Sequence, residues 1–286
     1  MNQPSKPVSA GLYLIATPIG NARDITLRAL DLLATADVLA AEDTRSLRRL
    51  LQIHGVALGG RPLIAVHDHS GAGVIARLVD AVAAGKSVVY ASEAGTPLVS
   101  DPGFTLARAV RAAGLAVTAA PGASAVLSAL TVSGLPAERF AFLGFLPAAR
   151  TARRTALADL VQVPFTLVLY ESANRVGEML EDMCQILGED REGAICRELT
   201  KRFEEVRRGT LRELAIGCAA IPPRGEIVVL AGPPGLVAPA EQDVKKALVR
   251  AMATLRIKDA ATVVAGAMGL PRRDVYQIAL RLEDDA

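Results

Sequence analysis

The chain has 286 residues, of which 51% are hydrophobic, and a formal net charge of +2. This length suits one large or two modest domains with a sizeable core, and the small net charge excludes a polycation that binds nucleic acid over its whole surface. Aromatic residues make up 3% of the chain and Trp is absent, which disfavours binding of nucleic acid mainly by base stacking.

The three cysteines indicate a reducing compartment. They are far apart, without zinc-type spacing, and their odd number does not suggest a disulfide framework. The short polar N-terminus lacks the apolar segment of a signal peptide. There is no charge-free run of about 18 apolar residues, so we expect no membrane span and a cytoplasmic protein.

The first half of the chain alternates short apolar runs with amphipathic stretches. This rhythm is typical of βαβ units and predicts a mainly parallel sheet. Asp24 is the expected N-cap of the first helix. The predicted strands are 11–16, 38–41, 63–66, 87–91 and 116–120, and the predicted helices are 24–34, 45–53, 74–83, 104–113 and one from 124.

After Gly134 the predicted strands follow one another more directly, which indicates a second α/β domain with a mixed sheet. The predicted domains are therefore 1–134, 135–232 and a C-terminal helical tail over 240–286, after a Pro- and Gly-rich linker. The predicted elements are strands 140–146, 165–170, 194–197, 203–207 and 225–230, a helix over 175–187, and tail helices 243–253, 258–268 and 272–282, the last two in a helix-turn-helix pattern.

The loops after the first five strands are rich in Gly, Pro and polar residues. In parallel α/β sheets ligands bind beyond the carboxyl ends of the strands, so these loops predict a binding site. They are 17–21, 42–45, 67–70, 92–97 and 121–125. Neither a dinucleotide-binding nor a Walker glycine pattern occurs, which disfavours an ordinary NAD or ATP site.

Simpler interpretations remain open for each loop. Glycine-proline pairs form ordinary turns, and Glu42, Asp43 and Thr44 can simply cap the following helix. His67 and His69 lie two residues apart, but no third metal ligand is evident, so no metal is expected.

Together these loops resemble the tetrapyrrole methylase family, in particular its members that methylate small-subunit ribosomal RNA. The similarity extends over most of the chain. It rests on the segments 17–21, 41–45, 67–69, 94–97, 100–103, 134–136, 144–147, 170–175, 197–201 and 225–226. One departure is Glu93, where family members usually have Asp.

The resemblance implies two α/β domains that bind S-adenosylmethionine (SAM), a homodimer, and methyl transfer to the ribose 2′-hydroxyl of a cytidine in the decoding region of 16S ribosomal RNA. It implies no partner DNA or membrane. The implied SAM-binding residues are Pro18, Ile19, Gly20, Glu93, Ala94, Gly95, Thr96, Pro97, Leu98, Ser124, Ala125, Tyr170, Glu171, Gly225 and Glu226.

Methyl transfer to a ribose hydroxyl also needs a group that accepts its proton. The candidates at predicted strand ends are Asp43, Glu42, His67 and Asp101, with Asp43 preferred, and Lys201 is a candidate to stabilise a developing alkoxide. The candidates for RNA phosphate contacts are Arg45, Arg150, Arg153, Arg154, Arg175, Arg197, Lys201 and Arg202, although each cluster can equally be a solvated surface.

Two other functions stay open. A methylase of a corrin-type tetrapyrrole would use the same scaffold on a small molecule. A non-catalytic protein that binds RNA and SAM would be expected to have eroded loops. The arginine-rich second half and the basic tail favour RNA as the substrate.

Overall fold

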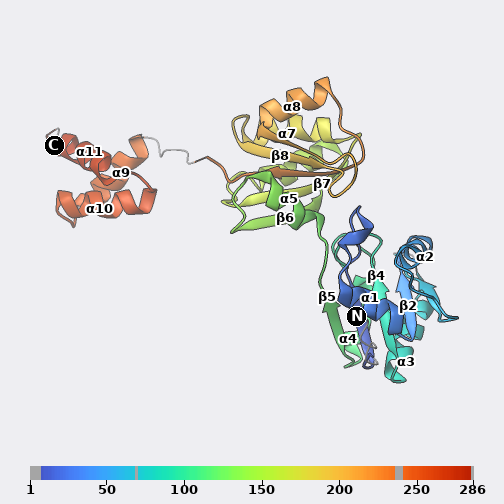
Figure 1. Ribbon diagram of the computed structural model, residues 1–286. Helices are drawn as coiled ribbons and strands as arrows, with labels where there is room; N and C mark the ends of the chain where they lie inside the picture. The colour runs from blue at the N-terminus through green and yellow to red at the C-terminus, as the bar shows by residue number, and fades with distance from the viewer. Residues whose placement is uncertain (1–7, 68–69, 236–240, 285–286) are drawn as a thin grey trace. The chain divides into compact units, whose positions relative to one another are not determined.

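The first half of the chain forms the predicted parallel sheet. The computed structural model describes residues 8–67, 70–235 and 241–284. The strand order is β3-β2-β4-β1-β5, and every neighbouring pair is parallel (Figure 1). The strands are β1 Gly11–Ile15, β2 Val38–Ala41, β3 Leu63–Ala65, β4 Ser87–Ala91 and β5 Val117–Ala120.

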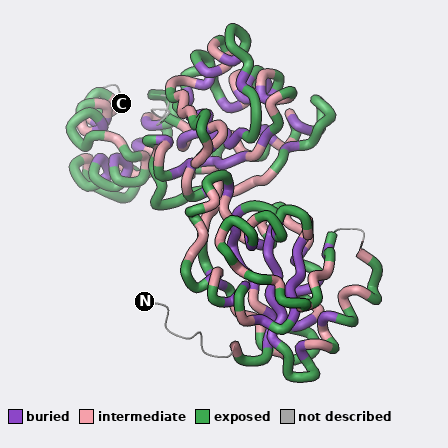
Figure 2. The backbone as a smooth tube through the Cα atoms, turned by 45° about the vertical axis from the view of Figure 1, so that its right-hand side comes forward, coloured by how far each residue is buried: buried purple, intermediate pink, exposed green. Residues whose placement is uncertain are grey.

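Helices cover both faces of this sheet. Successive strand residues point to opposite faces. Val88 and Tyr90 of β4 therefore pack with helices α3 and α4, whereas Val89 and Ala91 pack with α1 and α2. The helices are α1 Leu27–Thr35, α2 Thr44–Ile53, α3 Ala72–Ala83 and α4 Phe104–Ala112. Burial on both faces explains why the central strands read as continuous apolar runs (Figure 2).

The start of the first helix differs from the prediction. Asp24 is not its N-cap but the last residue of a short 3-10 helix, η1 (Ala22–Asp24), which Asn21 caps. The α-helix begins only after Thr26, whose hydroxyl accepts a hydrogen bond from the amide of Ala29 at 3.2 Å. The extended backbone of Thr26 separates the two helices, because an N-cap residue itself is not helical.

The second sheet is mixed, as predicted, with the order β6-β7-β10-β8-β9. Only β6 and β7 are parallel, and the other neighbouring pairs are antiparallel. The predicted strand 203–207 is wrong in its bounds, since β9 begins two residues later. The strands are β6 Phe140–Phe145, β7 Thr166–Ser172, β8 Glu192–Arg197, β9 Glu205–Thr210 and β10 Glu226–Ala231.

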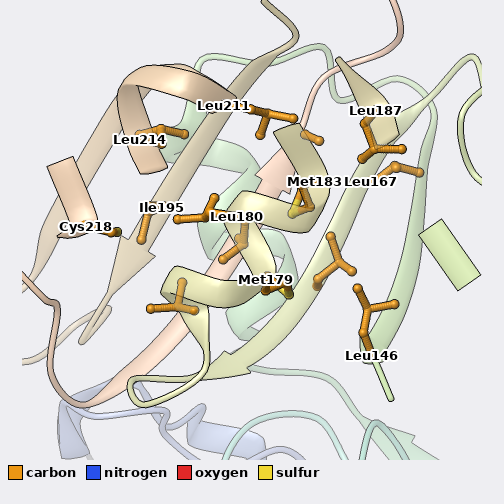
Figure 3. Packing of buried hydrophobic residues seen from close by; sticks show 14 of the residues in the cluster. Leu146, Leu167, Met179, Leu180, Met183, Leu187, Ile195, Leu211, Leu214 and Cys218 are labelled. Carbon is orange, nitrogen blue, oxygen red and sulfur yellow. The ribbon is translucent and has the colours of Figure 1, made fainter. Parts of the chain in front are cut away.

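Three helices cover one face of the second sheet: α6 Arg150–Ala158, α7 Val176–Leu187 and α8 Leu211–Ala220. Figure 3 shows Met179, Leu180 and Met183 of α7 in the core of this layer, with side chains of α8 and of the sheet around them. The sequence did not predict α8, although a capping box marks its start: Thr210 binds the amide of Glu213, whose carboxylate accepts from the amide of Thr210.

The opposite face of the second sheet packs against α5 (Ala125–Ser133), a helix that follows the last strand of the first sheet. Ala129 and Leu130 of α5 share a core with Val168 and Leu230 of the second sheet. Because α5 belongs to this core, the chain up to Pro233 clusters into one compact unit that contains both sheets. The predicted limits 1–134 and 135–232 thus assign each sheet's strands to a separate range. They do not separate the hydrophobic cores, because α5 lies in the first range but packs on the second sheet.

The C-terminal unit begins at Pro234 and has a core of its own. Its three helices are α9 Glu241–Met252, α10 Ile257–Met268 and α11 Arg272–Asp284, close to the predicted ranges. Gly269 ends α10 in a left-handed conformation, with φ of 65°, which provides the turn before α11. None of the described helices is long and apolar enough to cross a membrane.

Candidate functional site

The glycine-rich loop after β4 is bonded to the loops on either side of it. Thr17, after β1, exchanges two backbone hydrogen bonds with Gly95, both of 3.0 Å. The hydroxyl of Ser92 donates to the carbonyl of Gly95 at 2.5 Å, and that of Thr96 donates to the carbonyl of Ala123, before α5, at 3.1 Å. These bonds fix three strand-end loops as one rigid edge of the sheet.

A cavity of about 1040 Å³ lies at this edge, and residues of the second sheet also line it. It brings together most of the residues that the resemblance assigns to SAM. Those that line it are Pro18, Ile19, Gly20, Glu93, Ala94, Gly95, Thr96, Ser124, Ala125, Tyr170, Glu171, Gly225 and Glu226.

Two of the assigned residues, Pro97 and Leu98, are not among the cavity-lining residues. The backbone of Leu98 has a left-handed φ of 70°, and the residue is 36% exposed. The chain turns here, and the cavity wall resumes at Val99. Sequence reasoning also missed Phe145 and two residues of α2, Ser46 and Arg49, which line the cavity. Their spacing of three on a helix was the available signal.

A lysine held by two carboxylates lies on the wall that the second sheet contributes. The Nζ of Lys201 donates to Glu198 Oε1 at 3.0 Å and to Glu226 Oε2 at 2.9 Å. Burial opposes its positive charge, but the two carboxylates outweigh this and raise the pKa of Lys201. The hydrogen bond from the amide of Glu226, followed by that from Lys201, lowers the pKa of Glu198. Lys201 therefore stays protonated and can stabilise negative charge rather than accept a proton.

The two walls contact each other beside Lys201. The amide of Asn21, in the loop after β1, donates to Thr200 Oγ1 at 3.1 Å. A Cβ atom added to Gly20 would lie 2.7 Å from the same Thr200 oxygen and still closer to the Lys201 side chain. Only glycine permits so close an approach, so Gly20 keeps the two loops in contact at the edge of the cavity.

Four non-glycine residues of the described chain have a left-handed backbone, and all four belong to cavity-flanking loops. They are Leu98, Ser100, Glu198 and Thr200, with φ between 50° and 70°. Residues next to them in sequence, Asp101 and Leu199 among others, line the cavity. Backbone strain of this kind gathers at functional sites, where the surrounding structure enforces it.

Asp101 is a cavity carboxylate with well-defined surroundings. Its Oδ1 accepts hydrogen bonds from the amides of Leu98 at 3.2 Å and Gly103 at 2.9 Å. The buried hydroxyl of Tyr90 lies 3.0 Å from Oδ1 and 3.1 Å from Oδ2. Burial, together with the charge of Asp101, raises the pKa of Tyr90, so this phenol remains a proton donor.

The other predicted proton acceptors differ in position. Glu42 lines the cavity, but Asp43 and His67 do not. Asp43 is the N-cap of α2, and its carboxylate pairs with Arg45 Nη2 at 2.7 Å. The hydrogen bonds from the side chain and amide of Arg45 lower the pKa of Asp43 to about 2. The capping role that the sequence left open thus occupies the Asp43 carboxylate, and the preference for Asp43 as the base stays a prediction that this geometry does not support.

His67 is exposed, with its amide bonded to Ser70 Oγ at 2.8 Å. Its sequence neighbour His69, the second half of the histidine pair, lies outside the described residues. Within the described chain, no three side chains of the metal-binding types are grouped as a site.

Three of the predicted RNA contacts converge on one buried carboxylate instead. Arg150, Arg153 and Arg154 all bind Asp182 of α7, at distances from 2.8 to 3.2 Å. The side chain of Arg153 is 1% exposed and also pairs with Glu178. Its predicted RNA contact is wrong, since a buried, paired guanidinium cannot reach a phosphate. Sequence showed the arginine cluster but not its acidic partner 28 to 32 residues away.

Of the remaining arginines predicted to contact RNA, two are bound by other residues of the second sheet and its loops, and two are exposed. Arg175 donates to the carbonyl of Leu146 at 2.9 Å, and Arg197 pairs with Glu205 at 3.2 Å, so both support the second sheet. Arg45 is 89% exposed beside its Asp43 partner, and Arg202 is exposed as well. Arg45 and Arg202 therefore have guanidinium surface for an anionic ligand, as does Arg150, whose side chain is 61% exposed.

Comparison with known proteins identifies the fold and its family. The sequence profile of the tetrapyrrole (corrin/porphyrin) methylases matches residues 11–215. The chain belongs to this family. A second profile, the RsmI C-terminal HTH domain, matches residues 238–283, which cover the three helices of the C-terminal unit. The resemblance read from the strand-end loops is thereby confirmed.

Relatives of this methylase match it over nearly their full length. A Mesorhizobium japonicum protein named ribosomal RNA small subunit methyltransferase I is 45% identical, over 98% of this chain and 95% of the relative. A protein of the same name from Xylella fastidiosa is 42% identical, over 93% of this chain and 97% of the relative.

Solved structures share the fold of this methylase at low identity. A cobalt precorrin-4 methyltransferase superposes with a TM-score of 0.58 at 19% identity, over 77% of this chain and 94% of that one. A uroporphyrin-III C-methyltransferase from Thermus thermophilus, complexed with S-adenosylhomocysteine, gives 0.55 at 20% identity, over 78% and 97%. Both superpositions include nearly all of the solved structure but leave about a fifth of this chain unmatched.

Proposed function

We propose that this methylase transfers a methyl group from SAM to small-subunit ribosomal RNA, at the ribose 2′-hydroxyl of a cytidine in the decoding region. The observation that carries the proposal is the cavity, in which strand-end loops of the first sheet meet residues of the second sheet. Relatives named for this RNA activity match nearly the whole chain, including the C-terminal unit.

The cavity residues fit SAM in size and charge. A volume of about 1040 Å³ reaches the upper end of ordinary ligand pockets, about 300–1000 Å³, which leaves room for an acceptor group beside the cofactor. Its lining has five carboxylates (Glu42, Glu93, Asp101, Glu171 and Glu226) but only two cations, Arg49 and Lys201. An acidic lining suits a sulfonium cation.

The cofactor would be held by residues of both sheets and of the loops beside them. These are Pro18 to Gly20, Glu93 to Thr96, Ser124, Ala125, Tyr170 and Gly225. Ala94 and Gly95 belong to the edge that hydrogen bonds fix, and Tyr170 is fixed by ring contacts with Phe142 and Phe145 at 4.9 and 5.6 Å. When bound, SAM supplies a methyl group already activated on sulfonium. The chain itself must therefore orient the acceptor and take its proton.

Asp101 is the residue we assign to accept that proton. Its Oδ1 is engaged by two backbone amides, whereas its Oδ2 has only Tyr90 as a hydrogen-bond donor within the described chain. A carboxylate oriented in this way keeps one oxygen for an acceptor hydroxyl. Glu42, on the same cavity, is the alternative, and the protonated Lys201 would stabilise charge that develops on the hydroxyl oxygen.

The test is methyl transfer from labelled SAM to three acceptors: unmethylated small subunits, naked small-subunit RNA and a precorrin. We expect label in RNA, and 2′-O-methylcytidine among its nucleosides after digestion. Label in the precorrin alone would identify a tetrapyrrole methylase. Binding of SAM without transfer to any acceptor would favour a non-catalytic protein.

We further propose that the methylase is a cytoplasmic homodimer. Large apolar side chains are exposed on several elements of the isolated chain, including Leu27, Phe104 and Phe203 at 81%, 59% and 63%. Such side chains would be covered where two copies of the chain meet, as in the homodimer that the family resemblance implies. Light scattering on the purified protein would give the mass of a dimer, and a monomeric mass would overturn this part of the proposal.

A further inference from the structure

Helix α2 presents one face to the cavity region. Ser46, Arg49 and Ile53 recur at spacings of three and four residues, which places them on one stripe of the helix. The helix is held in place by its buried side chains, since Leu47 and Leu51 pack in the core of the first sheet. The direction of the stripe is therefore set by packing and does not depend on a ligand.

This stripe also lines a second, smaller pocket of about 190 Å³. Leu50 and Ile53 contribute apolar surface to this side pocket, and Ala22 contributes from the start of η1. The side pocket is contiguous with the main cavity, because five residues line both. The shared residues are Pro18, Gly20, Ser46, Arg49 and Glu93.

Arg49 lies at this junction, and its guanidinium is available to bind a ligand. Arg49 is exposed, and no described residue forms a hydrogen bond or ion pair with its guanidinium. Its neighbour on the helix, Arg45, is held by Asp43, and Arg61 is held by backbone carbonyls such as Leu33 O at 2.7 Å. A free guanidinium is well suited to a phosphate, which it can bind through two parallel N–H donors.

The remaining lining suits a nucleobase. Leu50 and Ile53 offer apolar contacts for a ring, and the Ser46 hydroxyl offers a hydrogen bond to its edge. A volume of about 190 Å³ is too small for a second cofactor but admits one planar ring. Proteins that recognise single-stranded RNA splay its bases into separate pockets of this kind.

We propose that the side pocket binds the nucleotide next to the methylated one, and that Arg49 binds the phosphate that joins the two. The inference rests on the proposed function and extends it to a second nucleotide. It explains why the carboxylate-rich cavity has an unpaired arginine at its junction with the side pocket. The contact gives affinity and register for RNA, whereas SAM binding does not require it.

The experiment compares Arg49→Gln with Arg48→Gln in the full chain. Arg48 is an exposed arginine on the same helix that lines neither pocket, so it is a matched control for loss of one positive charge. On small subunits, we expect Arg49→Gln to raise KM about tenfold while kcat changes less than twofold. The slope of log affinity against log salt concentration should become shallower by about 1, the change expected for the loss of one phosphate contact. Arg48→Gln should match the wild type, and Arg49→Lys should recover part of the loss.

A second variant, Ile53→Glu, tests the base pocket through an exposed position that should not affect folding. It should raise KM for RNA without changing SAM affinity, as measured by calorimetry. Equal KM values for Arg49→Gln and Arg48→Gln, in a wild-type protein that methylates RNA, would overturn the side pocket and leave the proposed function intact. A wild type that methylates only the precorrin would overturn both.

Discussion

The hydroxyl of Tyr90 lies within hydrogen-bond distance of both carboxylate oxygens of Asp101, at 3.0 and 3.1 Å. Tyr90 is fully buried in β4, at the centre of the first sheet, whereas Asp101 lines the cavity. The pair thus connects the rigid core of the sheet to the site and fixes the orientation of one acidic side chain there.

Replacement of Asp101 by Asn should abolish most of the methyl transfer. The amide keeps the shape of the side chain but cannot accept the hydroxyl proton, so kcat should fall by about 10²- to 10⁴-fold. Tyr90→Phe should cost less, about tenfold, since the carboxylate remains but loses its orientation. Steady-state rates, with SAM affinity as the control for folding, check both variants. Full activity in Asp101→Asn would move the assignment to Glu42.

Loss of Asp182 should destabilise the second sheet and its helices. Three arginines bind this fully buried carboxylate, and removal of one partner from a buried ion pair costs about 3–5 kcal/mol. We expect Asp182→Ala to lower the free energy of unfolding by this amount in chemical denaturation. Glu178→Ala removes the exposed partner of the same Arg153 and should cost no more than about 1 kcal/mol.

The same carboxylate predicts a pH dependence. Burial alone would raise the pKa of Asp182, but hydrogen bonds from Arg153, Arg150 and Arg154 outweigh it and lower the pKa. Because the folded pKa is below the unfolded value of about 3.9, the stabilisation is complete above that pH and is lost as pH falls through the folded pKa. The difference in Tm between wild type and Asp182→Asn should therefore be constant from pH 7 to 5 and shrink below pH 4.

Gly225→Ala should weaken SAM binding about tenfold or more. Gly225 has a φ of +87°, and an added Cβ would collide with the Glu198 carboxylate, which holds Lys201 and the amide of Glu226. Calorimetric titration with SAM checks this. Gly217→Ala, in the open interior of α8, is the matched control; it should leave SAM affinity unchanged and stabilise the helix by about 0.5–1 kcal/mol.

A chain that ends at Pro233 should still bind SAM. All cavity-lining residues lie between Pro18 and Val228, and the C-terminal unit has a separate core. We expect SAM affinity within about twofold of the full chain and a higher KM for small subunits. An unchanged KM would mean that the C-terminal unit does not contribute to RNA binding.

Local patterns predicted the sheets and loops well, because strand periodicity and Gly-Pro turns depend on near neighbours. Contacts between distant segments were beyond reach: the partner of Arg153 lies on another helix, and α5 packs on the second sheet although it follows the first. Asp43 shows a different limit, since one Asp before a helix can be either a cap or a base, and only geometry distinguishes the two.

The four left-handed residues beside the cavity have a consequence for protein engineering. Glycine at Leu98 or Ser100 would relieve about 1–2 kcal/mol of local strain, partly offset by the greater freedom of the unfolded chain, whereas glycine at Glu198 or Thr200 would also remove the hydrogen bonds of those side chains. A selection for heat resistance would therefore be expected to yield glycine substitutions in these loops. Variants found there would gain stability by loosening the walls that orient the reactants, so thermostable forms of this enzyme should be sought elsewhere in the chain.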